Sequence, residues 1–273
     1  MVTVDNLAFS YGSKEVLKNI SLQIKEGGIY GLLGENGVGK TTLLTLLCGL
    51  KRPAEGSIDV DGFIPFERKP SLLQSQFYLP DEVEPLASSA LDFAKENGVF
   101  WPGFQLGKFL TIMKELEVDE NQRMDAMSAG QLKKTWISFA LACNARYYYL
   151  DEPTNGLDIP SKAQFRKALS LHVNEEATVV ISTHQVRDLE NIIDPIIILD
   201  NREVLVNATI EQITEKFFFD YGTEVLPGAL YMEQVPGGCI QVVPNTTGEE
   251  SKVNLEAFFN TVHNHKDLVK QLF

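Results

Sequence analysis

A glycine-rich segment has the residue types and spacing of a phosphate-binding loop. It fits the pattern G-x-x-x-x-G-K-[ST] at every fixed position, and its residues are Gly34, Glu35, Asn36, Gly37, Val38, Gly39, Lys40 and Thr41, with Thr42 next in the chain. Glycines let several backbone N–H groups point at one phosphate, and a following helix adds the positive end of its dipole. We therefore expect a nucleoside triphosphate here, with Lys40 on its β- and γ-phosphates and the Thr41 hydroxyl on Mg²⁺.

Two adjacent carboxylates, Asp151 and Glu152, follow the apolar run Tyr147–Leu150. Adjacent acids at a strand end are usually just solvated. In a chain with a phosphate loop, we expect Asp151 to hold Mg²⁺ through its water shell and Glu152 to polarise the attacking water. Positioning and charge compensation do most of the catalysis in phosphoryl transfer, and a general base adds about 10²–10⁴-fold.

Apolar runs alternate with helix-like stretches along the chain, which predicts a mainly parallel sheet covered on both faces. The expected strands are Gly28–Leu33, Tyr147–Leu150, Thr178–Ser182 and Ile196–Leu199, and Lys40–Leu50 has helical spacing. Residues 86–127 contain no convincing strand and offer two helix-like stretches, Ser88–Asn97 and Phe104–Leu116. After Phe217, short strands and a closing helix over Asn254–Val262 form a tail.

Composition narrows the function classes. The 273 residues include 24 Lys and Arg against 37 Asp and Glu, a formal charge of -13. A polyanionic nucleic acid is therefore a poor partner, because phosphate neutralisation supplies most of its affinity. No stretch qualifies as a membrane span or a signal peptide, and Cys48, Cys143 and Cys239 form no C-x-x-C pair. A cytoplasmic protein with inert thiols is expected.

A third motif makes the comparison specific. Met127-Ser128-Ala129-Gly130-Gln131 resembles the L-S-G-G-Q signature of the ATP-binding subunits of ATP-binding cassette (ABC) transporters. The tail, with Phe217-Phe218-Phe219 and the closing segment Leu255–Phe259, resembles the short C-terminal extensions of bacterial export-type subunits. Asp151–Asp158 resembles the family's acidic strand and following loop. Ser182-Thr183-His184 resembles its switch histidine, and Tyr11 its adenine-stacking aromatic. The resemblance spans residues 1–206.

This resemblance implies an α/β P-loop NTPase fold with a mainly parallel core sheet, an antiparallel β subdomain and an inserted helical subdomain. Residues 1–215 would be the ABC ATPase domain, with the helical subdomain at about 86–127, and residues 216–273 a small C-terminal extension. The implied cofactors are ATP and Mg²⁺.

The implied site is shared between two subunits. His184 would hold the γ-phosphate and attacking water with Glu152, while Ser128, Gly130 and Gln131 would contact ATP bound to the opposite subunit, head to tail. Two alternatives stay open: Tyr11 as a core-covering aromatic, and Asp158 as a helix cap in place of an interface residue.

The sequence departs from the family pattern at three positions. Met127 and Ala129 replace the signature leucine and first glycine, and Ala129 in a first helical turn needs no positive φ. Asp81 stands where the family has its lid glutamine, and we expect it near Mg²⁺ or a water of the ion.

The implied partners are a second ATP-binding subunit and a separately encoded integral membrane permease, with no nucleic acid. The chain would sit peripherally on the inner face of the cell membrane, the permease near Asp81 and the helical insertion, and drive export. Phe100 and Trp101 are expected in the core, with permease docking as their alternative. The rival functions are a soluble non-transport ABC ATPase acting on ribosomes or DNA, and a nucleotide-binding regulator without catalysis.

Overall fold

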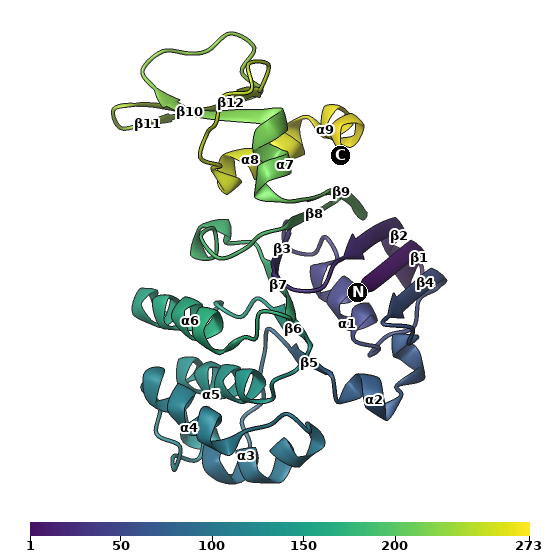
Figure 1. The fold of residues 1–273 in the computed structure, drawn as a ribbon, viewed down its shortest axis with the longest axis vertical. Coiled ribbons are helices and arrows are strands. Elements are labelled where there is room, and N and C mark those ends of the chain that lie inside the picture. The colour runs from purple at the N-terminus through teal and green to yellow at the C-terminus, as the bar shows by residue number, and fades with distance from the viewer.

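The computed structural model describes residues 1–273 and is organised around a six-stranded sheet (Figure 1). The strand order is β5-β6-β7-β3-β8-β9, and only β9 runs antiparallel to its neighbour. The strands are β3 (Ile29–Leu33), β5 (Gln76–Leu79), β6 (Tyr147–Asp151), β7 (Thr178–Thr183), β8 (Ile196–Asp200) and β9 (Glu203–Ala208). Strands β6 and β7 are buried throughout, as expected of parallel strands covered on both faces. The α/β fold with a mainly parallel sheet is confirmed.

A second sheet, antiparallel and of order β2-β1-β4, encloses helix α1 against the first. Its strands are β1 (Val2–Tyr11), β2 (Lys14–Ile24) and β4 (Glu55–Val60). Helix α1 (Lys40–Leu47) contributes four leucines to an apolar cluster of 22 buried residues that draws on both sheets. An enclosed helix is apolar nearly all round, and this packing fixes the loop between β3 and α1.

Helices replace strands between β5 and β6. They are α3 (Ala90–Asn97), η2 (Gly98–Phe100), α4 (Leu106–Glu115), η3 (Met124–Ala126) and α5 (Ala129–Ala142). They lie together beside α6 (Ile159–His172), at the lower left of Figure 1. The short elements η1 (Pro65–Glu67) and α2 (Pro70–Leu73) precede β5, and η4 (Val186–Asp188) follows β7. Helices α3 and α4 fall within the two helix-like stretches expected from the sequence.

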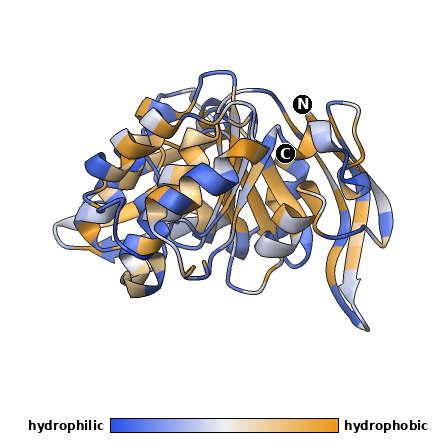
Figure 2. Cartoon of the chain, turned by 90° about the horizontal axis from the view of Figure 1, so that it is seen from below, coloured by the Kyte–Doolittle hydropathy of each residue, from blue (hydrophilic) through white to orange (hydrophobic).

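The chain ends in an antiparallel sheet, of order β10-β12-β11, packed on helices (top of Figure 1). The elements are α7 (Ile210–Lys216), β10 (Phe217–Gly222), β11 (Tyr231–Val235), β12 (Gly238–Pro244), α8 (Leu255–Asn264) and α9 (Lys266–Leu272). One apolar cluster of 46 residues runs from the helical part through the central sheet to Phe217 and Phe258. Hydrophobic residues gather on the inner strands and hydrophilic residues on the surrounding loops (Figure 2).

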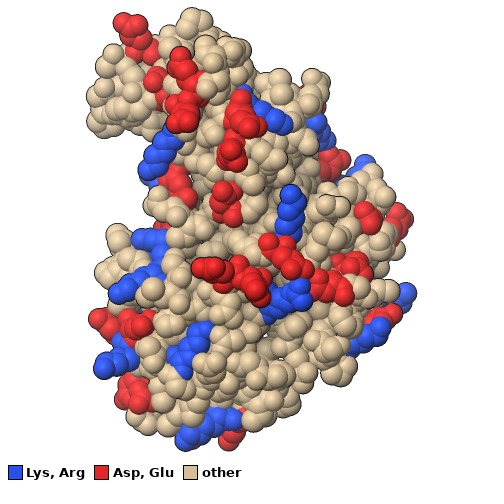
Figure 3. Space-filling model, viewed as in Figure 1, with Lys and Arg blue, Asp and Glu red and all other residues tan.

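Acidic side chains are prominent on the surface, in keeping with the charge of -13. They form a band across the middle of the face in Figure 3 and cover part of the C-terminal sheet, with Lys and Arg scattered between them. None of the helices combines the length and apolarity that crossing a bilayer needs.

Candidate nucleotide site

The phosphate loop is packed too closely for side chains at two of its glycines. A Cβ on Gly34 would lie 2.5 Å from the carbonyl oxygen of Leu199, and one on Gly39 would lie 2.8 Å from Cδ2 of Leu17. Gly39 also has φ +118° and Gly37 has φ +80°, conformations that glycine adopts without a Cβ penalty. These positions therefore need glycine for the fold of the loop itself.

Lys40 curls back over this loop. Its Nζ donates to the carbonyl oxygens of Gly34 at 2.8 Å and Glu35 at 3.2 Å, and lies 3.3 Å from Oε1 of Glu152. The residue is only 6% exposed. A buried ammonium needs an anionic partner, and Glu152 supplies it here.

Asp151 and Glu152 are oriented by β7, the neighbouring strand. Ser182 Oγ donates to Oδ1 of Asp151 at 2.5 Å and accepts from the Glu152 N–H at 3.0 Å. Glu152 has φ +44°, a conformation costly for a side chain with a Cβ and kept only where neighbours enforce it. Ser182 is thus a site residue whose role the sequence analysis missed, although a polar residue ending an apolar strand was its signal.

His184 completes this group at the end of β7. Its Nδ1 lies 3.0 Å from Oε1 of Glu152, and its N–H donates to Oε2 at 3.4 Å. Oε1 is buried without a hydrogen bond, because its approaches to Lys40 and His184 lack the required geometry. A buried carboxylate oxygen that lies close to both a lysine and a histidine is a candidate for acting on a bound molecule.

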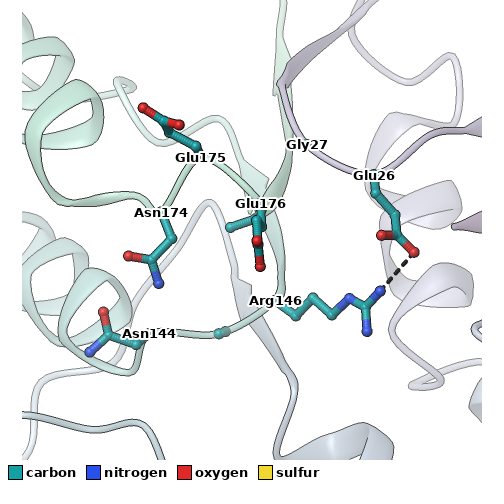
Figure 4. A pocket seen from close by; sticks show the side chains of 9 residues that line it. Glu26, Gly27, Asn144, Arg146, Asn174, Glu175 and Glu176 are labelled. Carbon is teal, nitrogen blue, oxygen red and sulfur yellow. Dashed lines mark hydrogen bonds and ion pairs between the residues drawn. The ribbon is translucent and has the colours of Figure 1, made fainter.

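A cavity of about 680 Å³ lies at the opposite end of the same strands (Figure 4). Residues preceding β3, β6 and β7 line it, among them Glu26, Arg146 and Glu176, and Arg146 Nη2 pairs with Glu26 at 2.7 Å. Ligands of open parallel sheets bind at the carboxyl ends of the strands. Gly34 and His184 directly follow β3 and β7, and Asp151 is the last residue of β6. Geometry therefore favours the phosphate loop over this cavity as the nucleotide site.

A family model described as ABC transporter matches residues 17–155 of this chain. The chain belongs to the ABC transporter ATP-binding family. It is 30% identical to the SkfA peptide export ATP-binding protein SkfE of Bacillus subtilis, over 79% of this chain and 92% of that protein. It is equally identical to the methionine import ATP-binding protein MetN of Carboxydothermus hydrogenoformans, over 78% of this chain and 67% of that protein.

One similar solved structure contains ADP and Pi, the products of ATP hydrolysis. This cassette superposes on an ATP-binding cassette dimer in a post-hydrolysis state bound to ADP and Pi, with a TM-score of 0.67 and 25% identity, over 77% of this chain and 99% of that one. The chain is thus an ATP-binding and ATP-hydrolysing subunit of an ABC transporter. Members of the family dimerise and work with membrane components.

The signature residues of this cassette line a cavity of their own, of about 290 Å³. Its lining comprises Ser128, Gly130, Gln131, Lys134, Gly156, Leu157, Asp158 and Ser161, with no residue of the phosphate loop. Ser128 caps α5: its Oγ accepts from the Gln131 N–H at 3.2 Å, and its own N–H donates to Gln131 Oε1 at 3.0 Å. Ala129 occupies the first turn without a positive φ, so its replacement of glycine costs no backbone strain.

Tyr11 and Asp158 each had two interpretations. Tyr11 is 47% exposed at the end of β1, and its Oη lies 3.4 Å from Oγ1 of Thr42, so its ring does not cover the core. Asp158 caps α6 through a 2.9 Å bond from the Ser161 N–H and also lines the signature cavity. Its cap role is therefore compatible with a place at an interface.

The donor set near the phosphate loop suits Mg²⁺. Thr41 offers an exposed hydroxyl at the start of α1, and Asp151 offers a carboxylate of which one oxygen is already bonded to Ser182. No cluster of three or more His, Cys, Asp or Glu is arranged to hold a metal without help. Mg²⁺ is usually held by one or two protein oxygens together with substrate phosphates and water. These residues fit an ion that binds with the nucleotide.

Two further features near the site were not foreseen. The Asp81 carboxylate is bonded to Asn155 and lies beside a buried lysine, Lys133. Phe259 of α8 lines a cavity of about 240 Å³ with Glu35 and His184. The C-terminal unit, residues 216–273, therefore reaches the phosphate loop. Lys133 and Lys134 are adjacent near the start of α5, and no local pattern showed that Lys133 is the buried one. No local pattern pointed to Phe259 either.

Proposed function

We propose that this chain and a second ATP-binding subunit close head to tail on two ATP molecules. The observation that carries the proposal is the separation of the signature cavity from the phosphate loop within one chain. Each nucleotide then lies between the phosphate loop of one subunit and the signature of the other. The dimer of a similar cassette with ADP and Pi supports this arrangement.

The residues of one site divide the work. Tyr11 stacks on adenine, residues 34–42 bind the phosphates, and Ser128, Gly130 and Gln131 of the opposite subunit approach the γ-phosphate. A capped helix start such as that of α5 directs N–H groups and its dipole toward an anion. Stacking of a base on an aromatic ring contributes about 1–3 kcal/mol.

Hydrolysis uses the groups around Oε1 of Glu152. The carboxylate accepts a proton from a water held with His184, the water oxygen attacks the γ-phosphorus, and the bridging oxygen leaves with ADP. Lys40 compensates the negative charge on the phosphates. Thr41 and, through water, Asp151 would hold Mg²⁺, which would supply further charge compensation.

To drive transport, the pair of ATP-binding subunits must act on a membrane subunit. We assign residues 1–215 to the ATPase domain, with the helical subdomain at about 86–127, and residues 216–273 to a C-terminal extension. The partner is a separately encoded integral membrane permease, on which this chain sits at the inner face of the cell membrane, and transport is outward. Export is supported by the 92% coverage of the peptide-export relative, against 67% of the methionine-import relative.

Capture of the tagged chain from detergent-solubilised membranes tests this function. An integral membrane protein should co-purify, and it should raise the ATPase rate of the chain after reconstitution into vesicles. Recovery with ribosomes and without a membrane protein would overturn the transport proposal. Lys40→Ala serves as the control for the rate, since it removes the phosphate-binding cation from the same assembly.

A further inference from the structure

Lys133 is a buried cation on α5, here called the signature helix, and it contacts the lid loop, residues 80–89 between β5 and α3. It lies in α5, five residues after Ser128, and is 3% exposed. Its Nζ donates to the carbonyl oxygens of Pro80 and Asp81, the former at 3.2 Å, and lies 3.8 Å from Oδ1 of Asp81. Burial lowers the pKa of Lys133, and the Asp81 carboxylate opposes that shift. A buried charge is costly unless it is paired, so this lysine depends on Asp81.

Asp81 has a second partner on a third element. The Nδ2 amide of Asn155 donates to Oδ1 of Asp81 at 3.0 Å. Asn155 is itself bonded to Glu152, because its backbone N–H donates to the Glu152 carbonyl oxygen at 3.0 Å. One carboxylate therefore connects the lid loop, the signature helix and the loop that follows the catalytic acid.

These contacts conflict with Mg²⁺ binding by Asp81. The carboxylate is the only acidic group within 4 Å of the Lys133 ammonium. Were Asp81 to swing to a metal ion, Lys133 would keep only backbone carbonyls as hydrogen-bond partners and the weaker influence of the more distant Asp151 and Glu152 carboxylates. Removing one partner of a buried charge pair is strongly unfavourable, because the other charge is left uncompensated.

We propose that Asp81 and Lys133 form a charge latch that positions the lid loop on the signature helix and, through Asn155, steadies the loop of Glu152. Both are positioning residues, and Asp81 is not a metal ligand. The proposal rests on the ATPase mechanism described above and deepens it, because the latch joins the helix that contacts one ATP to the acid that acts on the other.

A double substitution tests the latch. Asp81→Gln leaves the Lys133 charge unpaired, so kcat should fall about tenfold or more, where tenfold corresponds to 1.36 kcal/mol in the barrier. The KM for ATP and the Mg²⁺ concentration giving half-maximal rate should not move. Asp81→Gln with Lys133→Gln replaces the pair by two amides and should recover most of kcat. Asp81→Glu, which keeps the charge, should also retain most of the rate.

Glu84→Gln is the matched control, since Glu84 is exposed in the same loop and should leave the rate unchanged. A raised Mg²⁺ requirement in Asp81→Gln, without recovery in the double variant, would show a metal ligand and overturn the latch. A double variant no faster than Asp81→Gln at an unchanged Mg²⁺ requirement would also overturn it. If Asp81→Gln fails to fold, the double variant and Asp81→Glu are each compared with wild type. The latch requires that both of them retain most of the wild-type kcat. Absence of ATPase in the wild type itself would instead refute the proposed function.

Discussion

Lys40 Nζ lies 3.3 Å from Oε1 of Glu152, and both side chains are buried, so the proposed phosphate-binding cation and the proposed catalytic acid compensate each other within one chain. A triphosphate in the loop competes with Glu152 for this lysine, since both are anions. Oε1 keeps its 3.0 Å approach to His184 Nδ1, which holds it close to the end of β7. In the proposed mechanism, nucleotide binding would therefore release Glu152 from its contact with the Lys40 ammonium group.

Glu152→Gln should slow ATP hydrolysis by about 10²–10⁴-fold while leaving ATP binding intact. The amide keeps the size of the side chain but cannot accept the proton of the attacking water. With hydrolysis blocked, the ATP-bound dimer should accumulate in size-exclusion chromatography with light scattering. Glu175→Gln, at the opposite end of the strands, should behave as wild type. Near-normal turnover in Glu152→Gln would rule out Glu152 as the base.

Ser128→Arg should abolish hydrolysis without preventing the monomer from binding ATP, because its bulk and charge fall on the partner's nucleotide. Losing the helix cap also costs about 1 kcal/mol of stability, so the thermal midpoint is measured alongside. An equal mixture with Lys40→Ala gives the sharper result. A mixed dimer pairs an intact phosphate loop with an intact signature in one of its two sites, so activity should reappear in the mixture. Two inactive proteins that stay inactive together would contradict the shared site.

The motifs could be read from the sequence because each lies in one short segment with local requirements. Gly37 and Gly39 adopt positive φ angles that glycine allows at no Cβ penalty, and the Ser128 cap is made with Gln131 three residues away. Such constraints leave a trace in residue type and spacing. Four of the six strands of the central sheet, β3, β6, β7 and β8, and helices α3 and α4 were predicted from local patterns in the same way.

Contacts between distant segments left no such trace. Asp81 and Lys133 meet only because α5 packs against the lid loop. Phe100 and Trp101 were both expected in the core, but the structure separates them. Trp101 Nε1 donates to the Gln76 carbonyl oxygen at 2.9 Å, whereas Phe100 is 63% exposed, so its assignment to the core was wrong. Adjacent residues at a helix end point in different directions, and only the packing decides which is buried.

Asp61→Asn should weaken the loss of stability in acid. The Asp61 carboxylate is bonded to the Met1 amino group at 2.6 Å and the Tyr147 hydroxyl at 2.8 Å, with Arg146 at 3.2 Å. Burial raises the pKa of Asp61, but these partners outweigh it and lower the pKa overall. A lowered pKa in the folded state gives stability above the ordinary pKa of Asp, lost as pH falls toward the folded value.

Urea unfolding measured below about pH 5 checks this, where the free energy of unfolding of the wild type should fall more steeply than that of Asp61→Asn. Glu96→Gln, an exposed carboxylate without an ion-pair partner, should keep the wild-type slope. Equal slopes for wild type and Asp61→Asn would show that the Asp61 contacts add no pH-dependent stability.

Phe258→Ala should destabilise the whole chain by about 3–5 kcal/mol, the usual cost of emptying a buried aromatic site. Phe258 is fully buried in α8, with its ring 5.5 Å from that of Phe217. Helix α8 also contacts the segment that follows His184, because its Leu255 N–H donates to Oε1 of Glu190 at 2.9 Å. Tyr221→Ala, at an exposed ring in the same unit, should cost far less.

The fluorescence of the two tryptophans, Trp101 and Trp136, reports only on the helices between β5 and β6. Circular dichroism reports on every helix and strand. Since one apolar cluster joins the C-terminal unit to that part, the two signals should give coincident transitions in wild type and in Phe258→Ala. An early circular-dichroism transition without a tryptophan change would mean that residues 216–273 unfold on their own. Coincident transitions, both shifted by Phe258→Ala, would make the C-terminal unit part of the folding unit that carries the nucleotide site.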